Sequence, residues 1–197
     1  AFSGGGEISI SDTMDIASGV VFTNAPGGPS LRLTGGELVG DGSFVNQTLF
    51  SVTDGTIDVD FTNAANGVLQ ADNGSATING PFANLAGATL SVVSDSDDAS
   101  LVLPSDFSNV GLISFAGDTA HTGTFDLGTS TLTNEAGAEI RVSSGAHRIE
   151  GVLENASGGL ISIQNADAEL SLESEAVNAG SIMLSGGTLS GDDITNN

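Results

Sequence analysis

The chain contains no cysteine, tryptophan, tyrosine or lysine, and these absences exclude several classes of protein. Without cysteine there are no disulfides and no cysteine-ligated zinc. Three arginines stand against 25 acidic residues, which gives a formal net charge of −22. We expect no nucleic-acid partner and no binding to anionic membranes, because both are held through Lys and Arg. No apolar run approaches the roughly 18 residues that a membrane-spanning helix needs, so we expect no membrane insertion.

The composition nevertheless favours a folded chain. Apolar residues make up 39% of the 197 residues, and the acidic residues are scattered rather than gathered in blocks. This length suffices for one domain or for a run of structural repeats. The chain begins at Ala1, and we expect 1–197 to be a mature chain or a fragment of a longer secreted repeat protein. The absence of cysteine suits a secreted, extracellular or cell-surface bacterial product.

A short phrase recurs along the chain: a bulky apolar residue, one spacer and an asparagine. Successive asparagines are 17 to 25 residues apart, with a mean of 22. A glycine follows most copies within a few residues, although the copy at Asn46 lacks it. The copies are Phe22-Thr23-Asn24, Phe44-Val45-Asn46, Phe61-Thr62-Asn63, Phe82-Ala83-Asn84, Phe107-Ser108-Asn109, Leu132-Thr133-Asn134 and Leu153-Glu154-Asn155, with an altered eighth copy at Val177-Asn178.

Short stretches that alternate between apolar and polar residues lie between these phrases. Leu31-Arg32-Leu33, Ile140-Arg141-Val142 and Ile161-Ser162-Ile163 are examples. A period of two residues predicts half-buried strands, and we find no helical periodicity. The sequence therefore predicts an all-β protein.

The regular spacing favours a solenoid over a row of hairpins. We predict a right-handed parallel β-helix (β-solenoid) of about eight coils with about 22 residues each. Residues 1–21 would form an N-terminal coil or cap, and residues 22–197 the repeats. A β-sandwich built from hairpins is the alternative.

In such a coil, equivalent residues stack in columns along the axis. We predict a structural ladder of side-chain amides, because stacked asparagines hydrogen-bond to one another. Its members are Asn24, Asn46, Asn63, Asn84, Asn109, Asn134, Asn155 and Asn178. We also predict a structural aromatic stack in the core, formed by Phe22, Phe44, Phe61, Phe82 and Phe107, in preference to a platform that stacks on sugars.

The asparagine phrase between short alternating strands resembles the repeat regions of filamentous-haemagglutinin-type exoproteins and autotransporter passenger domains. The resemblance runs from about Phe22 to Asn196. These families are secreted bacterial right-handed β-helices. The resemblance implies a long adhesive or scaffolding rod on the outer surface.

Residues that could perform catalysis are few. No Gly-x-Ser-x-Gly elbow is present, and we expect His121 and His147 to be solvent-facing or corner residues. Asp58 and Asp60 lie on one strand face by parity, but two nearby carboxylates are expected by chance among 25 acids. We therefore predict no catalytic and no cofactor-binding residues. A polysaccharide lyase or glycoside hydrolase is the enzymatic alternative.

One acidic stretch could supply hard oxygen ligands. Asp95, Asp97 and Asp98 are the candidate metal ligands, with Ca²⁺ as the ion, although EF-hand spacing is absent. An exposed acidic loop that keeps the rod soluble is the alternative. No other cofactor is expected.

Taken together, these patterns predict an extracellular structural or adhesive β-solenoid that forms part of a bacterial surface rod, adhesin or self-assembling fibre. The alternative is a carbohydrate-active β-helix enzyme or a glycan-binding spike of the phage type. The expected partners are other copies of the chain placed end to end, or a glycan or protein of a host or neighbouring cell surface.

Overall fold

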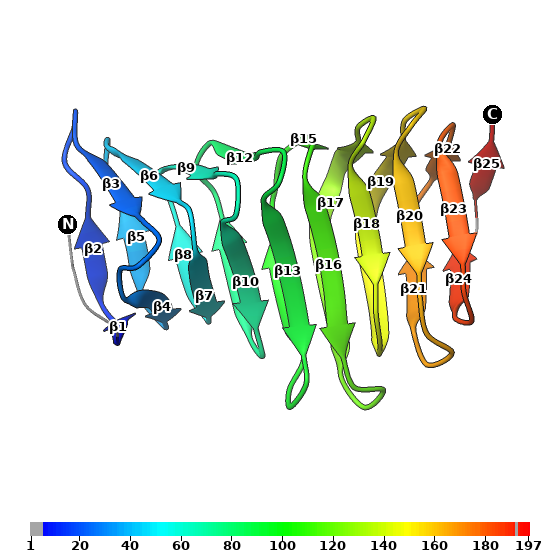
Figure 1. The fold of residues 1–197 in the computed structure, drawn as a ribbon, viewed down its shortest axis with the longest axis horizontal. Helices are drawn as coiled ribbons and strands as arrows, with labels where there is room; N and C mark the ends of the chain where they lie inside the picture. The colour runs from blue at the N-terminus through cyan, green and yellow to red at the C-terminus, as the bar shows by residue number, and fades with distance from the viewer. Residues whose placement is uncertain (1–5, 192) are drawn as a thin grey trace.

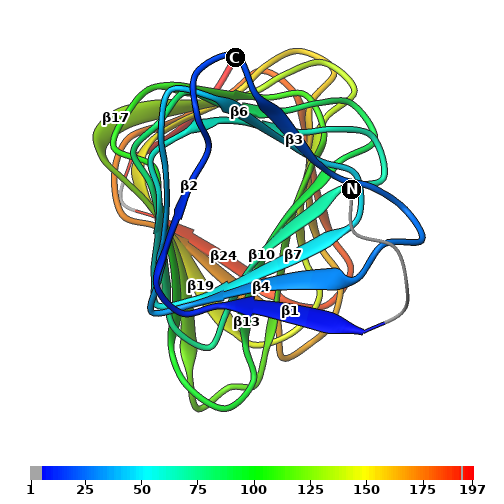
Figure 2. The ribbon, with the colours of Figure 1, turned by 90° about the vertical axis from the view of Figure 1, so that its left-hand side faces the viewer.

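The structure is a computed structural model that describes residues 6–191 and 193–197. Every strand pairing within these residues is parallel, and none of them forms a helix. The chain winds through nine coils, each of which contributes a strand position to three faces (Figure 1). Seen along the axis, the coils superimpose into a three-sided cross-section (Figure 2). The all-β parallel solenoid is thus confirmed, with nine coils rather than about eight, and the β-sandwich alternative is wrong.

Face A is a nine-stranded parallel sheet whose neighbours are one coil apart in sequence. Its strands are β1 (Glu7–Ile10), β4 (Ser30–Thr34), β7 (Leu49–Thr53), β10 (Val68–Asp72), β13 (Thr89–Ser94), β16 (Leu112–Gly117), β18 (Glu139–Val142), β20 (Leu160–Ile163) and β23 (Ser181–Leu184).

Face B follows face A in every coil. Its strands are β2 (Thr13–Asp15), β5 (Glu37–Val39), β8 (Gly55–Ile57), β11 (Ser75–Ile78), β14 (Ala99–Val102), β17 (Thr122–Asn134), β19 (Ala146–Asn155), β21 (Glu169–Leu172) and β24 (Thr188–Gly191). Two of these strands, β17 and β19, are long enough to bend round the next corner, and their pairing shifts register between Asp126 and Thr131.

Face C completes each coil. It begins with β3 (Val21–Asn24), β6 (Ser43–Asn46), β9 (Asp60–Asn63) and β12 (Phe82–Asn84), which form a four-stranded sheet. It continues through β15 (Phe107–Asn109), the second halves of β17 and β19, β22 (Ala176–Asn178) and β25 (Ile194–Asn196).

The apolar residues of each alternating stretch point into the coil and stack in columns. On face A, for example, Ile113, Ile140 and Ile161 are register partners on successive strands, and each is almost completely buried. Alternation places their polar neighbours outside, because successive side chains of a strand point to opposite faces. The core therefore consists of columns of stacked apolar side chains that run parallel to the axis of the solenoid.

The structure places the eight predicted asparagines in one column at the end of face C. In each pair of successive coils, the Nδ2 of the earlier asparagine donates to the Oδ1 of the later one, over 2.7 to 3.1 Å. Asn196 extends the column by one member, because Asn178 Nδ2 donates to its Oδ1 over 2.9 Å. Sequence analysis missed Asn196, although Ile194-Thr195-Asn196 has the same phrase.

The five predicted phenylalanines also stack inside the coil. Successive ring centroids from Phe22 to Phe107 are 5.0 to 5.9 Å apart. Phe50 joins the stack from face A, 5.2 Å from Phe44, and this contact was not predicted. After Phe107 the column passes to the smaller Leu132 and Leu153, its register partners on β17 and β19.

Candidate functional site

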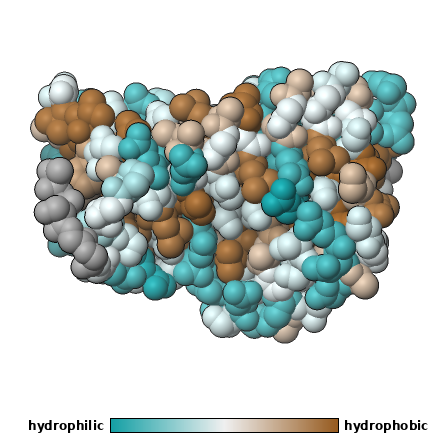
Figure 3. All heavy atoms as spheres, in the orientation of Figure 1, coloured by the Kyte–Doolittle hydropathy of each residue, from teal (hydrophilic) through white to brown (hydrophobic). Residues whose placement is uncertain are grey.

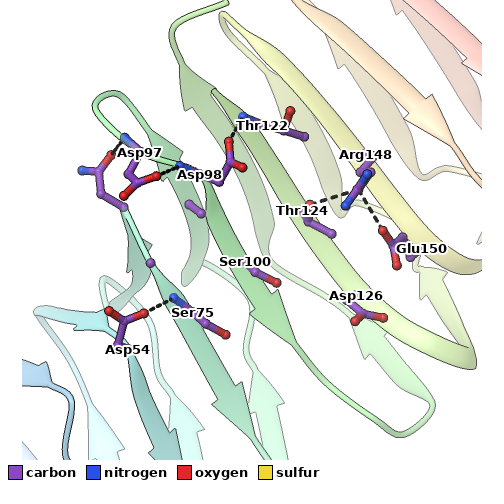
Figure 4. Close-up of a pocket in the computed structure, with 13 residues that line it drawn as sticks. Asp54, Ser75, Asp97, Asp98, Ser100, Thr122, Thr124, Asp126, Arg148 and Glu150 are labelled. Carbon is purple, nitrogen blue, oxygen red and sulfur yellow. Dashed lines mark hydrogen bonds and ion pairs between the residues drawn. The ribbon is translucent and has the colours of Figure 1, made fainter. Parts of the chain in front are cut away.

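A hollow on the outer surface lies on face B, near the corner where the chain arrives from face A (Figure 4). It has a volume of about 460 Å³ and is open to solvent. Most of its lining residues are polar. The lining residues are Asp54, Asn73, Gly74, Ser75, Asp97, Asp98, Ala99, Ser100, Thr122, Thr124, Asp126, Arg148 and Glu150.

Register explains why these side chains meet. Ser75, Ser100, Thr124 and Arg148 are partners on the successive strands β11, β14, β17 and β19. They point outward because their neighbours Ala76, Leu101, Phe125 and Ile149 fill the core. Neighbouring strands lie about 4.8 Å apart, so the four side chains form a straight row across the floor of the hollow.

Arg148 is the only cation in the hollow, and it is held by its neighbours. Its Nε lies 2.8 Å from Glu150 Oε1 and donates to Thr124 Oγ1 over 3.1 Å. Its side chain is 46% exposed. Five carboxylates, those of Asp54, Asp97, Asp98, Asp126 and Glu150, surround the hollow. The site is therefore suited to hydrogen-bonding a neutral or cationic polar ligand and should repel an anionic one.

The other arginines are also engaged. Arg141 pairs with Glu139 over 2.6 Å, and this hydrogen-bonded pairing raises the pKa of Arg141. Arg32 lies 3.7 Å from Asp72. Each arginine of the chain thus has an acidic partner.

The candidate metal ligands lie on the loop between β13 and β14. Asp95, Asp97 and Asp98 are exposed, and the latter two bind backbone amides rather than face one another. Asp97 Oδ1 accepts from the Asp98 amide, and Asp98 Oδ1 accepts from the Thr122 amide of the next coil. Among the described residues no group of three His, Cys, Asp or Glu side chains is placed to hold a metal ion. Calcium binding stays a prediction, and a melting curve unchanged by chelation would contradict it.

His147 is not solvent-facing, and that part of the sequence interpretation is wrong. The side chain is 2% exposed, because it alternates with Ile149 on the inner face of β19. Its Nε2 lies 2.7 Å from the Ser144 carbonyl oxygen, and its Nδ1 has no hydrogen-bond partner within the described residues. Burial lowers the pKa of His147 despite opposing contributions from the Ser144 and Gly123 backbones. The sequence did contain a sign of this burial, because His147 lies two residues before the apolar Ile149 and therefore on the same side of the strand.

The remaining candidates do not line the hollow. His121 stands at the exposed loop before β17, with Nδ1 4.0 Å from Asp98 Oδ1. Asp58 and Asp60 are both exposed at the corner between faces B and C, where Asp58 Oδ1 accepts from Asn79 Nδ2. The structure does not bring these residues together into a catalytic group with a histidine.

Comparison with family models, with curated proteins and with solved structures found no match. No helix in the described part of the chain is long and apolar enough to cross a membrane.

Proposed function

We propose that the chain is a non-enzymatic structural segment of an extracellular bacterial rod, of the filamentous-haemagglutinin or autotransporter-passenger kind, that serves as part of an adhesin or fibre. The observation that carries the proposal is the asparagine ladder from Asn24 to Asn196. Each of its contacts joins one coil to the next. Such a ladder resists bending and extension along one axis, which is the property a rod requires.

Contact with further coils or copies at the ends is part of the proposal. The ladder has a direction, because each Nδ2 donates toward the C-terminal coil. The ladder therefore begins with the Oδ1 of Asn24, which is 4% exposed, and ends with the Nδ2 of the exposed Asn196. These groups are complementary, and Met183 and Leu184, on the face A strand of the last coil, are also exposed. A second copy placed end to end, or a further coil of a longer chain, would meet the same contacts.

The extracellular location is proposed from composition. A chain without cysteine and with −22 formal charges needs no oxidative folding and stays soluble outside the cell. Protease treatment of intact source cells tests this, because only a surface-exposed chain is degraded without lysis.

The hollow on face B supports a second candidate, a glycan-binding or glycan-cleaving protein. Asp126 and Glu150 are register partners on β17 and β19, and both are half-buried. Two carboxylates about 5 to 10 Å apart are the requirement of glycoside hydrolysis. The hollow would favour neutral sugars, because five carboxylates repel uronates.

One pair of measurements separates the candidates. We expect no release of reducing sugar from neutral glycans, and filaments or adhesion when the purified chain is imaged by electron microscopy or applied to cell-surface glycans. Sugar release that disappears in both Asp126→Asn and Glu150→Gln, but persists in Asp58→Asn, would replace the structural proposal with the enzymatic one.

A further inference from the structure

The charge of the rod is concentrated on one side. All but six of the acidic residues that the structure describes lie on face B or on the two corners that flank it, which we call the acidic side. The six others are Glu7, Asp60, Asp72, Glu135, Glu139 and Glu154. Faces A and C and the corner between them form the near-neutral side, which also carries Arg32 and Arg141.

The exposed large apolar side chains follow the opposite pattern. Val21, Leu49, Leu85, Val110, Met183 and Leu184 are each 39 to 62% exposed and lie on the near-neutral side. Val20, the remaining one, immediately precedes β3. Apolar residues also stand along the upper edge and across face A in Figure 3.

These side chains are densest along the corner between faces C and A. We call the apolar edge the set Leu49, Val68, Leu85, Val110, Leu112 and Leu160, which start face A strands or lie in the turns before them. Leu49, Leu85 and Val110 are 39, 43 and 40% exposed, and the other three are half-buried. Glu135 is the only charged residue in the turns of this corner.

Turn length shapes the apolar edge. Residues 110–111 join faces C and A in two residues, whereas the flanking coils use the four residues 85–88 and 135–138. The short turn leaves a hollow of about 340 Å³ between two ridges. Ala86, Val110 and Leu112 contribute to its apolar lining, and the paired Glu139 and Arg141 stand at its rim. Such a hollow has room for an aliphatic side chain from outside.

We propose that the apolar edge is a lateral docking surface for a second copy of this chain, so that two rods pair side by side with their acidic sides facing outward. For side-by-side contact, a second copy meets the strongest repulsion on the acidic side and the weakest on the near-neutral side, because the acidic side of each rod carries most of its charge. In a two-fold arrangement each copy presents the same edge, and Leu85 of either copy would enter the hollow beside Val110 of the other.

The available area suits a weak pair. The apolar edge spans the six coils from Leu49 to Leu160, about 29 Å at about 4.8 Å per coil. A contact about 20 Å wide would then cover roughly 580 Å² on each copy, below the roughly 800 Å² per partner of a standard interface, so we expect a pair that forms at tens of micromolar. This is about 7% of the 8304 Å² accessible surface.

The proposal deepens the structural function above, since it names a lateral contact for a rod whose end contacts are a separate feature. The test is the mass and shape of the purified full chain at tens of micromolar, by light scattering and small-angle X-ray scattering, in about 0.15 M and about 0.5 M NaCl. We expect a dimer that strengthens with salt, because salt screens the residual repulsion. Its length should match one rod, and its cross-section should contain two.

Matched variants locate the contact. Leu85→Asp with Val110→Asp should raise the dissociation constant at least about 100-fold, since each change occurs on both copies. Thr119→Asp with Ala120→Asp adds the same charge to an exposed loop of the acidic side and should leave the dimer intact. Circular dichroism checks that both variants fold.

Cross-linking gives a second measurement on a chain that has no cysteine of its own. Val110→Cys should form a disulfide-linked dimer under mild oxidation, and Ala120→Cys should not. A chain that stays monomeric at both salt concentrations overturns the proposal. A dimer that is weakened equally by the Leu85/Val110 double variant and by the Thr119/Ala120 double variant also overturns it. An elongated dimer also overturns the lateral contact while leaving the end-to-end contact standing.

Discussion

At the residue scale, the interior asparagines of the ladder combine burial with hydrogen bonding of both the amide nitrogen and the amide oxygen. Asn63 is fully buried, accepts from Asn46 Nδ2 over 2.9 Å, and donates to Asn84 Oδ1 and to the Thr89 carbonyl oxygen over 2.8 Å each. A buried amide without partners would be costly. The ladder is therefore stable because each asparagine donates the hydrogen bond that the buried Oδ1 of the next asparagine needs.

Replacing one member should reveal this coupling. We expect Asn63→Ala to lower the free energy of unfolding by about 2 to 4 kcal/mol, because it leaves Asn84 Oδ1 buried without its ladder donor. Asn196→Ala at the exposed end of the column should cost less than about 1 kcal/mol. Urea denaturation measures both, and equal losses would contradict the explanation.

His147 is the residue that should make stability depend on pH. The folded chain holds it neutral, with a lowered pKa, whereas the unfolded chain protonates it near the ordinary value of about 6.5. Below that pH the unfolded state binds more protons, so this group's contribution to the free energy of unfolding falls as the pH falls. The loss approaches about 1.4 kcal/mol per pH unit until the folded-state pKa is reached.

The contribution of His147 to the pH dependence of stability is isolated by comparing variants across pH 5 to 8. Leucine already occupies the equivalent inward position one coil later, at Leu170. We expect His147→Leu to remove the acid-dependent loss, as seen in chemical denaturation at each pH. His121→Ala, at the exposed loop, should retain it. Parallel pH profiles for wild type and His147→Leu would count against a buried neutral histidine.

At the scale of the element, the corner turns depend on glycine for two different reasons. Gly111 lies in the two-residue turn between β15 and β16, where an added Cβ would come within 2.6 Å of the Ala88 carbonyl oxygen and 2.7 Å of that of Leu85. Gly137 has open space around it but adopts a φ of 82°. The first glycine is required by close packing between coils, and the second by its backbone conformation.

The two sites should therefore respond differently to alanine. Gly111→Ala should cost about 3 kcal/mol, because backbone atoms of the neighbouring coil must move. Gly137→Ala should cost about 1 kcal/mol, the strain of a left-handed conformation. Thermal unfolding monitored by circular dichroism ranks them, and a reversed order would show that the turn tolerates expansion.

At the scale of the whole molecule, the division between an acidic and a near-neutral side governs behaviour in salt. The formal charge of −22 includes a cluster of carboxylates at face B and its corners, whose mutual repulsion opposes the compact coil. Each arginine is already paired, so little internal compensation remains.

We expect the melting temperature to rise by several degrees between about 0.01 M and 0.5 M NaCl, because the Debye length shrinks from about 30 Å to below 10 Å. Scanning calorimetry at low protein concentration measures this without the contribution of pairing. Glu135→Gln, which removes an acid from the near-neutral side, should reduce the salt effect less than Asp97→Asn on the acidic side. A melting temperature independent of salt would contradict the repulsion.

The sequence by itself determined the strands, the coil repeat and the columns. Local alternation fixes which side chains are inward, and a recurring phrase such as Phe61-Thr62-Asn63 fixes which positions stack, because register follows from spacing. Only the tertiary structure decided which outward-facing side chains lie together on the surface. The row from Ser75 to Arg148 and the apolar edge depend on which residues of successive coils become register partners. That depends on loop and turn lengths, which vary from coil to coil and carry no periodic signal.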